Sequence, residues 1–317
     1  MLRQVKHYTA LLQQQNYKGF YLAVLRVAIS LWLLKEVCIN WQSMELLYGQ
    51  DAFFVPKNTI LNRLPGGPEF IKDHYIWLIC LYIVVIFLNI LGIGRWFTAL
   101  VLLVMFYLLY QMNMFFTNAG DKMARLILTY LVFADSYQYF VLLKEKTTSI
   151  NARRFRNLLS NLAALSIMIQ LCLAYFTLGI AKLNDPLWQH GQATYYALSM
   201  ERYTGTSLNK YLVQFKWLDV LSNYAVMLFE LGFPLLIWFK KLRKPLLLSG
   251  LVFHLCIYIF MMIYGFQIVF LMTYGLFLPD SFFTRLYLKA KRNLCRQSFR
   301  RTKHRLLSFK ILRQSIT

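Results

Sequence analysis

The chain has 317 residues, of which 58% are hydrophobic and only 15% are charged, and its formal net charge is +22. Soluble domains carry about a quarter charged residues, so this composition excludes an ordinary soluble protein. The basic residues cluster between and after long apolar runs, which is typical of membrane proteins rather than of nucleic-acid-binding proteins. We therefore predict an all-α, polytopic membrane helical bundle whose first partner is the lipid membrane, with no nucleic-acid partner.

Long apolar runs predict about eight transmembrane helices, because about 20 apolar residues span a bilayer. The expected spans cover residues 20–38, 75–91, 97–116, 123–143, 158–180, 220–239, a run that begins at 245, and a short or tilted return segment at 267–278. We expect a polar arm at 1–18, a transmembrane domain at 19–280 and a basic tail at 281–317, attracted to anionic lipids.

The positions of the basic residues predict the orientation of the chain. With the N-terminus in the cytoplasm, most of the 35 basic residues fall on the cytoplasmic side, and both termini lie there. We expect a multi-pass protein of the plasma membrane, which is the inner membrane if the source is bacterial. The loops 39–74 and 182–219, the turn 117–122 and the break 264–267 then share the outer face, so a site built from them opens outward.

A pair of oppositely charged residues lies inside the first and the fourth expected spans, where an isolated charge is costly. Arg26 lies in the first span and Asp135 in the fourth, toward the same side of the bundle, so one hypothesis is that they pair. The alternative for Arg26 is that its long side chain reaches the near headgroups.

A second pair of ionisable residues is expected near the middle of the membrane. Glu230 lies in the sixth span and His254 in the seventh, and adjacent antiparallel helices would bring both to mid-membrane. A buried glutamate with a nearby histidine indicates either a satisfied structural pair or a proton path.

The apolar run 158–180 leads directly to Lys182, about one turn beyond the hydrocarbon. Burial at such a boundary disfavours the charged form of an amine, and a neutral amine can act as a base. The alternative is an anchor lysine that marks the end of the span. Trp188 and His190 follow in an aromatic-rich loop, which indicates either a binding site for a flat ring or an interfacial aromatic belt.

The turn that holds Asn118 and Asp121 has a sufficient structural explanation, since both residue types cap helices and stabilise turns. The five cysteines form neither a CxxC motif nor a zinc-type spacing. We therefore predict no disulfide framework and no metal site.

Several short segments form a recognisable pattern by their order and spacing: Thr117-Asn-Ala-Gly-Asp121, Phe133-Ala-Asp135, Gly179-Ile-Ala-Lys182-Leu with Trp188 and Gly191, Phe229-Glu230 with Pro234, Phe253-His254 with Gly265-Phe266, and Leu271-Met-Thr-Tyr274. Through these segments, most of the chain, about 19–280, resembles the horizontally transferred transmembrane (HTTM) family. That family includes the vitamin K-dependent gamma-carboxylases and the sporulation-delaying protein B group. The turn with Asn-Ala-Gly-Asp is nearer to the sporulation-delaying protein B group, whose members are partners in maturing a secreted peptide toxin.

The resemblance implies that Lys182 is a catalytic base, because the matching lysine of the carboxylase is regarded as the base that deprotonates vitamin K hydroquinone. It implies a reduced, vitamin K-like quinone as cofactor and a secreted peptide or protein as substrate at the outer face. Where the carboxylase has an Asn-His pair, this chain has Ala119 and Gly120. Chemistry identical to carboxylation is therefore not expected.

Two classes of function follow. In the first, the protein is a quinone-dependent membrane enzyme with Lys182 as the base, and the side chains expected around it are Trp188, His190, Asn118, Asp121, His254 and Glu230. In the second, it is a non-catalytic membrane factor for the export, maturation or immunity of a secreted peptide, and Lys182 is dispensable. A transporter ranks last, since the sequence shows no inverted repeat.

Overall fold

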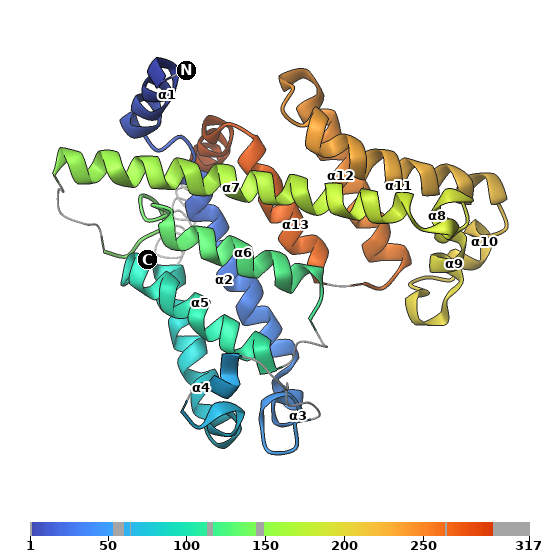
Figure 1. The fold of residues 1–317 in the computed structure, drawn as a ribbon, viewed down its shortest axis with the longest axis horizontal. Helices are drawn as coiled ribbons and strands as arrows, with labels where there is room; N and C mark the ends of the chain where they lie inside the picture. The colour runs from blue at the N-terminus through green and yellow to red at the C-terminus, as the bar shows by residue number, and fades with distance from the viewer. Residues whose placement is uncertain are drawn as a thin grey trace, which may run out of the picture. The chain divides into compact units, whose positions relative to one another are not determined.

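The computed structural model describes residues 2–52, 60–63, 65–112, 117–143, 149–263 and 265–293, and these contain no β-strand. This confirms the predicted all-α class (Figure 1). The helices are α1 (Leu2–Gln14), α2 (Gly19–Ile39), η1 (Trp41–Ser43), α3 (Met44–Tyr48), η2 (Ile60–Arg63), α4 (Gly67–Leu91), α5 (Arg95–Met112), α6 (Ala119–Phe133), α7 (Ile150–Leu183), α8 (Pro186–Gln189), α9 (Ala193–Ser199), η4 (Glu201–Tyr203), α10 (Asn209–Leu212), α11 (Lys216–Leu236), α12 (Lys240–Phe260), α13 (Phe266–Tyr274) and η5 (Gly275–Phe277).

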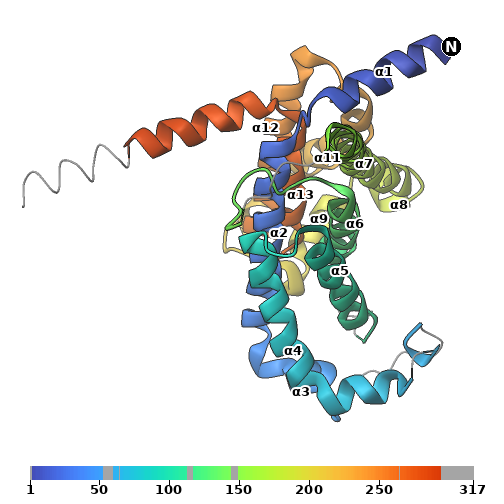
Figure 2. The same cartoon turned by 90° about the vertical axis from the view of Figure 1, so that its left-hand side faces the viewer.

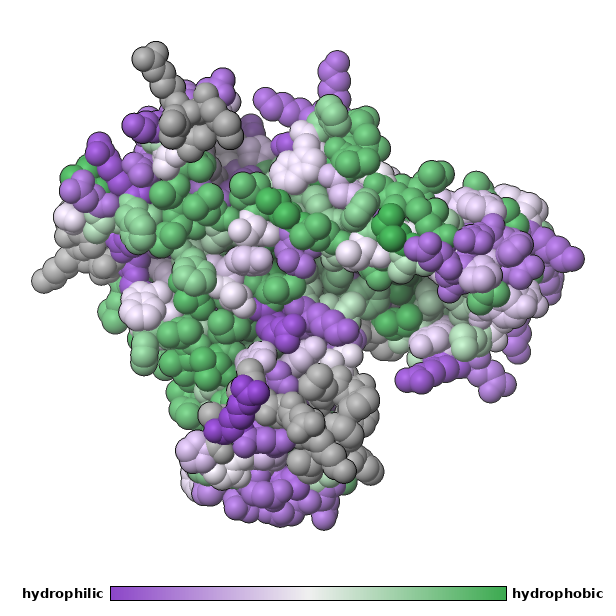
Figure 3. Space-filling view, in the orientation of Figure 1, coloured by the Kyte–Doolittle hydropathy of each residue, from purple (hydrophilic) through white to green (hydrophobic). Residues whose placement is uncertain are grey.

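Within the described ranges, five helices are long and apolar enough to cross a membrane: α4, α5, α7, α11 and α12. The number becomes six if the segments Phe266–Phe277 and Asp280–Asn293 count as one broken span. This composition indicates a multi-pass membrane protein. Figure 3 shows apolar side chains along α5 and α7 and polar side chains around α3 and α8 to α10.

The eight expected spans therefore exceed the five or six that the structure supports. The first expected span is helix α2, but α2 carries three charged residues and much of it is buried among other helices. The fourth expected span is a helix only as far as Phe133, where α6 ends after 15 residues. The short return segment expected at 267–278 is α13 followed by η5.

The chain divides into two compact units, Met1–Phe277 and Leu278–Thr317. In the second unit, the described residues form the helix Asp280–Asn293. Parts of the expected features fall outside the described residues: 53–59 and 64 of the loop 39–74, 113–116 at the end of the third expected span, 264 in the break 264–267, and the tail beyond 293. Residues 144–148, which follow the fourth expected span, also lie outside them.

In the first unit, α2 packs against α4 and α6, and Figure 2 shows α2 and α4 running alongside each other. Arg26 of α2 is only 1% exposed. Its guanidinium donates to the backbone carbonyls of Asn89 and Ile90 at the C-terminal end of α4, and to those of Tyr139 and Phe140. A helix C-terminus presents carbonyls without helical partners, so a cation is favoured there. The predicted pair of Arg26 with Asp135 is therefore wrong.

Asp135 instead pairs with Arg95, at 3.2 Å between Oδ1 and the guanidinium. It also accepts from Gln138, and its backbone N–H donates to Ser160 of α7 at 3.1 Å. These bonds hold the non-helical segment that follows α6, and that segment supplies two of the carbonyls around Arg26. The helix ends at Phe133 because the backbone groups of the following segment form hydrogen bonds with α2 and α7 instead of continuing the helix.

The longest helix, α7, packs along α11, and α12 and α13 complete this part of the first unit (Figure 1). Gly179 allows a close approach of α7 to α11, since a Cβ added there would lie 2.8 Å from a methyl carbon of Leu231 on α11. Lys182 follows Gly179 by three residues and Glu230 precedes Leu231. The small side chain at 179 therefore brings the two charged residues within reach of each other.

Candidate functional site

Lys182 lies in the last turn of α7 and forms an ion pair with Glu230 of α11. Its Nζ donates to both carboxylate oxygens, at 2.9 Å to Oε1 and 2.7 Å to Oε2. The side chains are 16% and 3% exposed, respectively. The lysine predicted at a membrane boundary is thus a partly buried member of an ion pair.

Trp188 completes the surroundings of the ammonium group. Asp185 caps the short helix α8 by accepting from the backbone N–H of Leu187. Asn223 of α11 donates to the carbonyl oxygen of Trp188 at 2.8 Å, which fixes α8 against α11. The indole ring then lies 4.9 Å from Nζ of Lys182, a distance that gives a cation–π interaction.

The Lys182–Glu230 pair lines a cavity of about 500 Å³, a volume in the range of small-molecule sites. The walls come from α7 to α13, with Ala119 of α6, and they are mostly apolar or aromatic. The apolar and aromatic lining residues include Leu178, Leu198, Leu212, Leu218, Val226, Phe253, Ile257, Phe260, Met261, Phe266 and Phe270. An apolar ligand with few polar groups matches such walls.

No protein-family model, curated protein or solved structure matches this chain. The resemblance drawn from the sequence therefore stays a prediction, and the geometry of the cavity has to carry the functional argument.

A second set of polar groups lines the same cavity on its α12 side. His254 is 1% exposed, and its Nε2 lies 2.7 Å from the hydroxyl of Tyr175 on α7. That hydroxyl also lies 2.6 Å from the hydroxyl of Tyr274 on α13. The histidine is thus the first member of a buried chain of three side chains.

Glu230 and His254 therefore share a cavity wall without pairing with each other, since their hydrogen bonds go to Lys182 and Tyr175. His254 and Asp219 both line the cavity. Nδ1 of His254 and Oδ2 of Asp219 are buried and have no hydrogen-bond partner among the described residues. Buried polar atoms are usually satisfied, so each of these two atoms needs an explanation.

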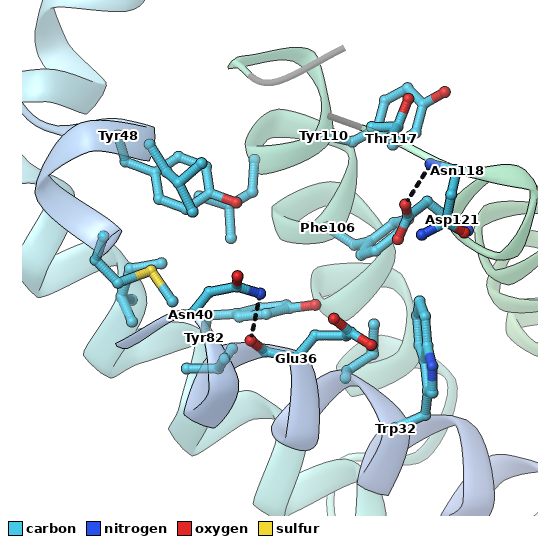
Figure 4. A pocket seen from close by; sticks show the side chains of 16 residues that line it. Trp32, Glu36, Asn40, Tyr48, Tyr82, Phe106, Tyr110, Thr117, Asn118 and Asp121 are labelled. Atoms are coloured by element: carbon cyan, nitrogen blue, oxygen red, sulfur yellow. Dashed lines mark hydrogen bonds between the residues drawn. The ribbon is translucent and has the colours of Figure 1, made fainter. Parts of the chain in front are cut away.

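Asn118 and Asp121 lie in a different pocket, of about 340 Å³, which Figure 4 shows. They form the predicted N-terminal cap of α6: the Asn118 side chain accepts from the backbone N–H of Gly120 and Asp121, and Asp121 accepts from the backbone N–H of Asn118. The carboxylates of Asp121 and Glu36 turn toward the same space. Burial, followed by the nearby charge of Glu36, raises the pKa of Asp121.

His190 does not join the cavity lining. It is exposed at the end of α8, and its Nδ1 lies 2.7 Å from the carbonyl oxygen of Pro186. Of the predicted site residues, the cavity thus gathers Lys182, Trp188, Glu230 and His254.

Among the polar residues of the cavity wall that sequence reasoning missed are Tyr175 and Asp219. Tyr175 precedes Lys182 by seven residues, which is two helical turns, so helical periodicity alone places both on one face of α7. Asp219 lies in the first turn of α11, and nothing in the sequence marked it as a site residue, because an aspartate in the first turn of a helix is common. Among the described residues, no group of three or more His, Cys, Asp or Glu side chains is arranged to hold a metal ion.

Proposed function

We propose that the protein is a membrane-embedded enzyme that binds a ring-bearing, quinone-like lipid in the cavity and removes a proton from a ligand hydroxyl with Lys182. The observation that carries this proposal is the ion pair of Lys182 and Glu230 in the wall of an otherwise apolar cavity. An apolar wall suits the ring and tail of the lipid, and a convergent acid–base pair suits its hydroxyl.

The ion pair supplies a balanced proton step. Transfer of a proton from Nζ of Lys182 to Glu230, across 2.7 Å, leaves a neutral amine beside a neutral acid. The amine then takes the proton of the ligand hydroxyl, which yields the ammonium group and a ligand oxyanion. The net change is proton transfer from ligand to Glu230, and the oxyanion replaces the carboxylate as the counter-ion of Lys182. Low polarity around the pair strengthens that final attraction.

A quinol deprotonated in this way gives up electrons to dioxygen more readily than the neutral quinol. We propose that the activated lipid serves the modification or maturation of a secreted peptide or protein at the outer face of the plasma membrane, with both chain termini cytoplasmic. The resemblance to the HTTM family supports this part of the proposal, as does the positive-inside bias of the sequence.

One observation favours a second candidate, a non-catalytic membrane factor that binds a peptide during export, maturation or immunity. Nζ of Lys182 is already engaged by a carboxylate and by the Trp188 ring. A fully engaged ammonium group is what a purely structural ion pair requires.

Oxidation of a reduced quinone tests the two candidates. The purified protein in mild detergent receives menadiol, and oxygen uptake and epoxide formation are followed by an oxygen electrode and mass spectrometry. Lys182→Ala should lose at least 100-fold in rate, the usual contribution of a positioned general base. Lys216→Ala, which removes an exposed lysine at the start of α11, is the matched control.

If Lys182→Ala oxidises menadiol at the wild-type rate, Lys182 is not the base of the reaction. A folded wild-type protein that neither turns over menadiol nor co-purifies with a quinone would favour the non-catalytic factor instead. Peptide capture that tolerates Lys182→Ala would then identify that function.

A further inference from the structure

The cavity wall contains a second polar side chain, His254, which takes no part in the proposed proton transfer. Nδ1 of His254 has no hydrogen-bond partner among the described residues, although the ring is 1% exposed and lines the cavity. An imidazole nitrogen without a partner in an apolar wall is costly, whichever nitrogen carries the proton. Ligand binding would supply the partner that the protein does not.

The buried tyrosines fix the orientation of this imidazole. Nε2 of His254 faces the Tyr175 hydroxyl at 2.7 Å, and that hydroxyl faces Tyr274 at 2.6 Å. The hydroxyl of Tyr175 has one proton to give. If Nε2 donates to Tyr175, Tyr175 donates to Tyr274 and Nδ1 remains an acceptor; with the reverse order, Nδ1 carries the proton. In both arrangements Nε2 is occupied and Nδ1 is the nitrogen left for a ligand.

The two polar positions lie on different helices and are not hydrogen-bonded to each other. Lys182 and Glu230 come from α7 and α11, whereas His254 comes from α12. A ligand with one oxygen can satisfy only one of these positions. A rigid ring with oxygens on opposite carbons offers one oxygen to each position of the shared cavity wall.

We infer that His254 is a positioning residue that binds the second oxygen of the ligand through Nδ1, and so selects rings with two oxygens over rings with one. This inference rests on the proposed function only in that the cavity must bind a ring-bearing ligand. It adds the residue that sets specificity and orientation.

Two probes that differ by one hydroxyl group test the inference: 1,4-dihydroxynaphthalene and 1-naphthol. Their dissociation constants are measured calorimetrically, without oxygen, on the full chain in the same detergent. The wild type should bind 1,4-dihydroxynaphthalene about tenfold more tightly, as one additional hydrogen bond in a buried site provides.

A matched pair of variants separates the two nitrogens of His254. In His254→Asn the amide group takes the place of Nδ1, and in His254→Gln it takes the place of Nε2. His254→Asn should keep the preference for two oxygens, and His254→Gln should reduce it to within about twofold. A purely structural role through Tyr175 predicts the opposite, with Gln tolerated and Asn not.

If the folded wild type binds both probes equally, the inference is overturned without any variant, while the proposed cavity ligand survives. If neither probe binds, both the inference and the proposed function fail. Loss of the preference in His254→Asn with retention in His254→Gln would overturn the inference and assign His254 to a structural role through Tyr175.

Discussion

Arg26 is a buried cation and Lys182 a partly buried cation of the helical bundle, and their surroundings differ. Arg26 is held by four backbone carbonyls and lies 4.9 Å from the ring centre of Tyr137. Lys182 has one carboxylate, one indole ring and a cavity of about 500 Å³ beside it. The sequence marks both as charges in apolar runs. Lys182 itself lines this cavity, whereas Arg26 is enclosed by the protein and lines none of the cavities described here. A charge within an apolar run therefore indicates a site only where its own side chain reaches a space that can hold a ligand.

The largest expected effect is the loss of stability on removal of the Arg26 guanidinium. Arg26→Met leaves buried carbonyls of Asn89, Ile90, Tyr139 and Phe140 without their donor, and should lower the free energy of unfolding by roughly 3–5 kcal/mol. Thermal unfolding in detergent measures it. Arg202→Met, at an exposed position, is the control, and a shift no larger than that of the control would contradict the structural role.

The stability lost on removal of Lys182 should be restored by a second substitution, which is not possible for Arg26 because its partners are backbone carbonyls. Lys182→Met leaves the Glu230 carboxylate buried and unpaired, which should cost about 3 kcal/mol of stability. Adding Glu230→Gln removes that charge, so the double variant should unfold within about 1 kcal/mol of the wild type while remaining inactive on menadiol. A double variant less stable than Lys182→Met would show that the pair is held by something other than mutual charge.

A smaller effect sharpens the assignment of the partner of Asp135. Exchanging the charges by Arg95→Asp with Asp135→Arg should recover part of the stability lost in each single variant, by about 0.5–1 kcal/mol. The exchange of Arg26→Asp with Asp135→Arg should recover nothing, since Arg26 contacts carbonyls rather than the carboxylate. Denaturant midpoints of the five variants decide between the two partners, and rescue in the second exchange would restore the pair predicted from sequence.

The smallest effect concerns the pocket of Asp121. Its raised pKa means that the folded state holds the proton more tightly than the unfolded chain, whose value is about 3.8. Stability from this group is therefore fully present below that value and is lost as pH rises through the raised pKa. Unfolding curves across acidic pH should show this loss in the wild type and not in Asp121→Asn. Glu36→Gln should move the loss to lower pH, because the charge of Glu36 contributes to the shift.

Several features followed from the sequence because they depend on neighbours along the chain. Apolar runs of sufficient length placed the helices α4, α5, α7, α11 and α12. The residues Asn118 and Asp121 predicted the cap of α6, because a cap is completed within four residues. Composition alone excluded an ordinary soluble domain.

The partners of the buried charges were decided by the tertiary structure. Asp135 pairs with Arg95 rather than Arg26, and Glu230 pairs with Lys182 rather than His254, because helix rotation and close approach at Gly179 select which side chains meet. The cavity likewise exists only where α7, α11, α12 and α13 pack around it. Periodicity along one helix fixes which residues share a face, and the face that opposes it is fixed by packing.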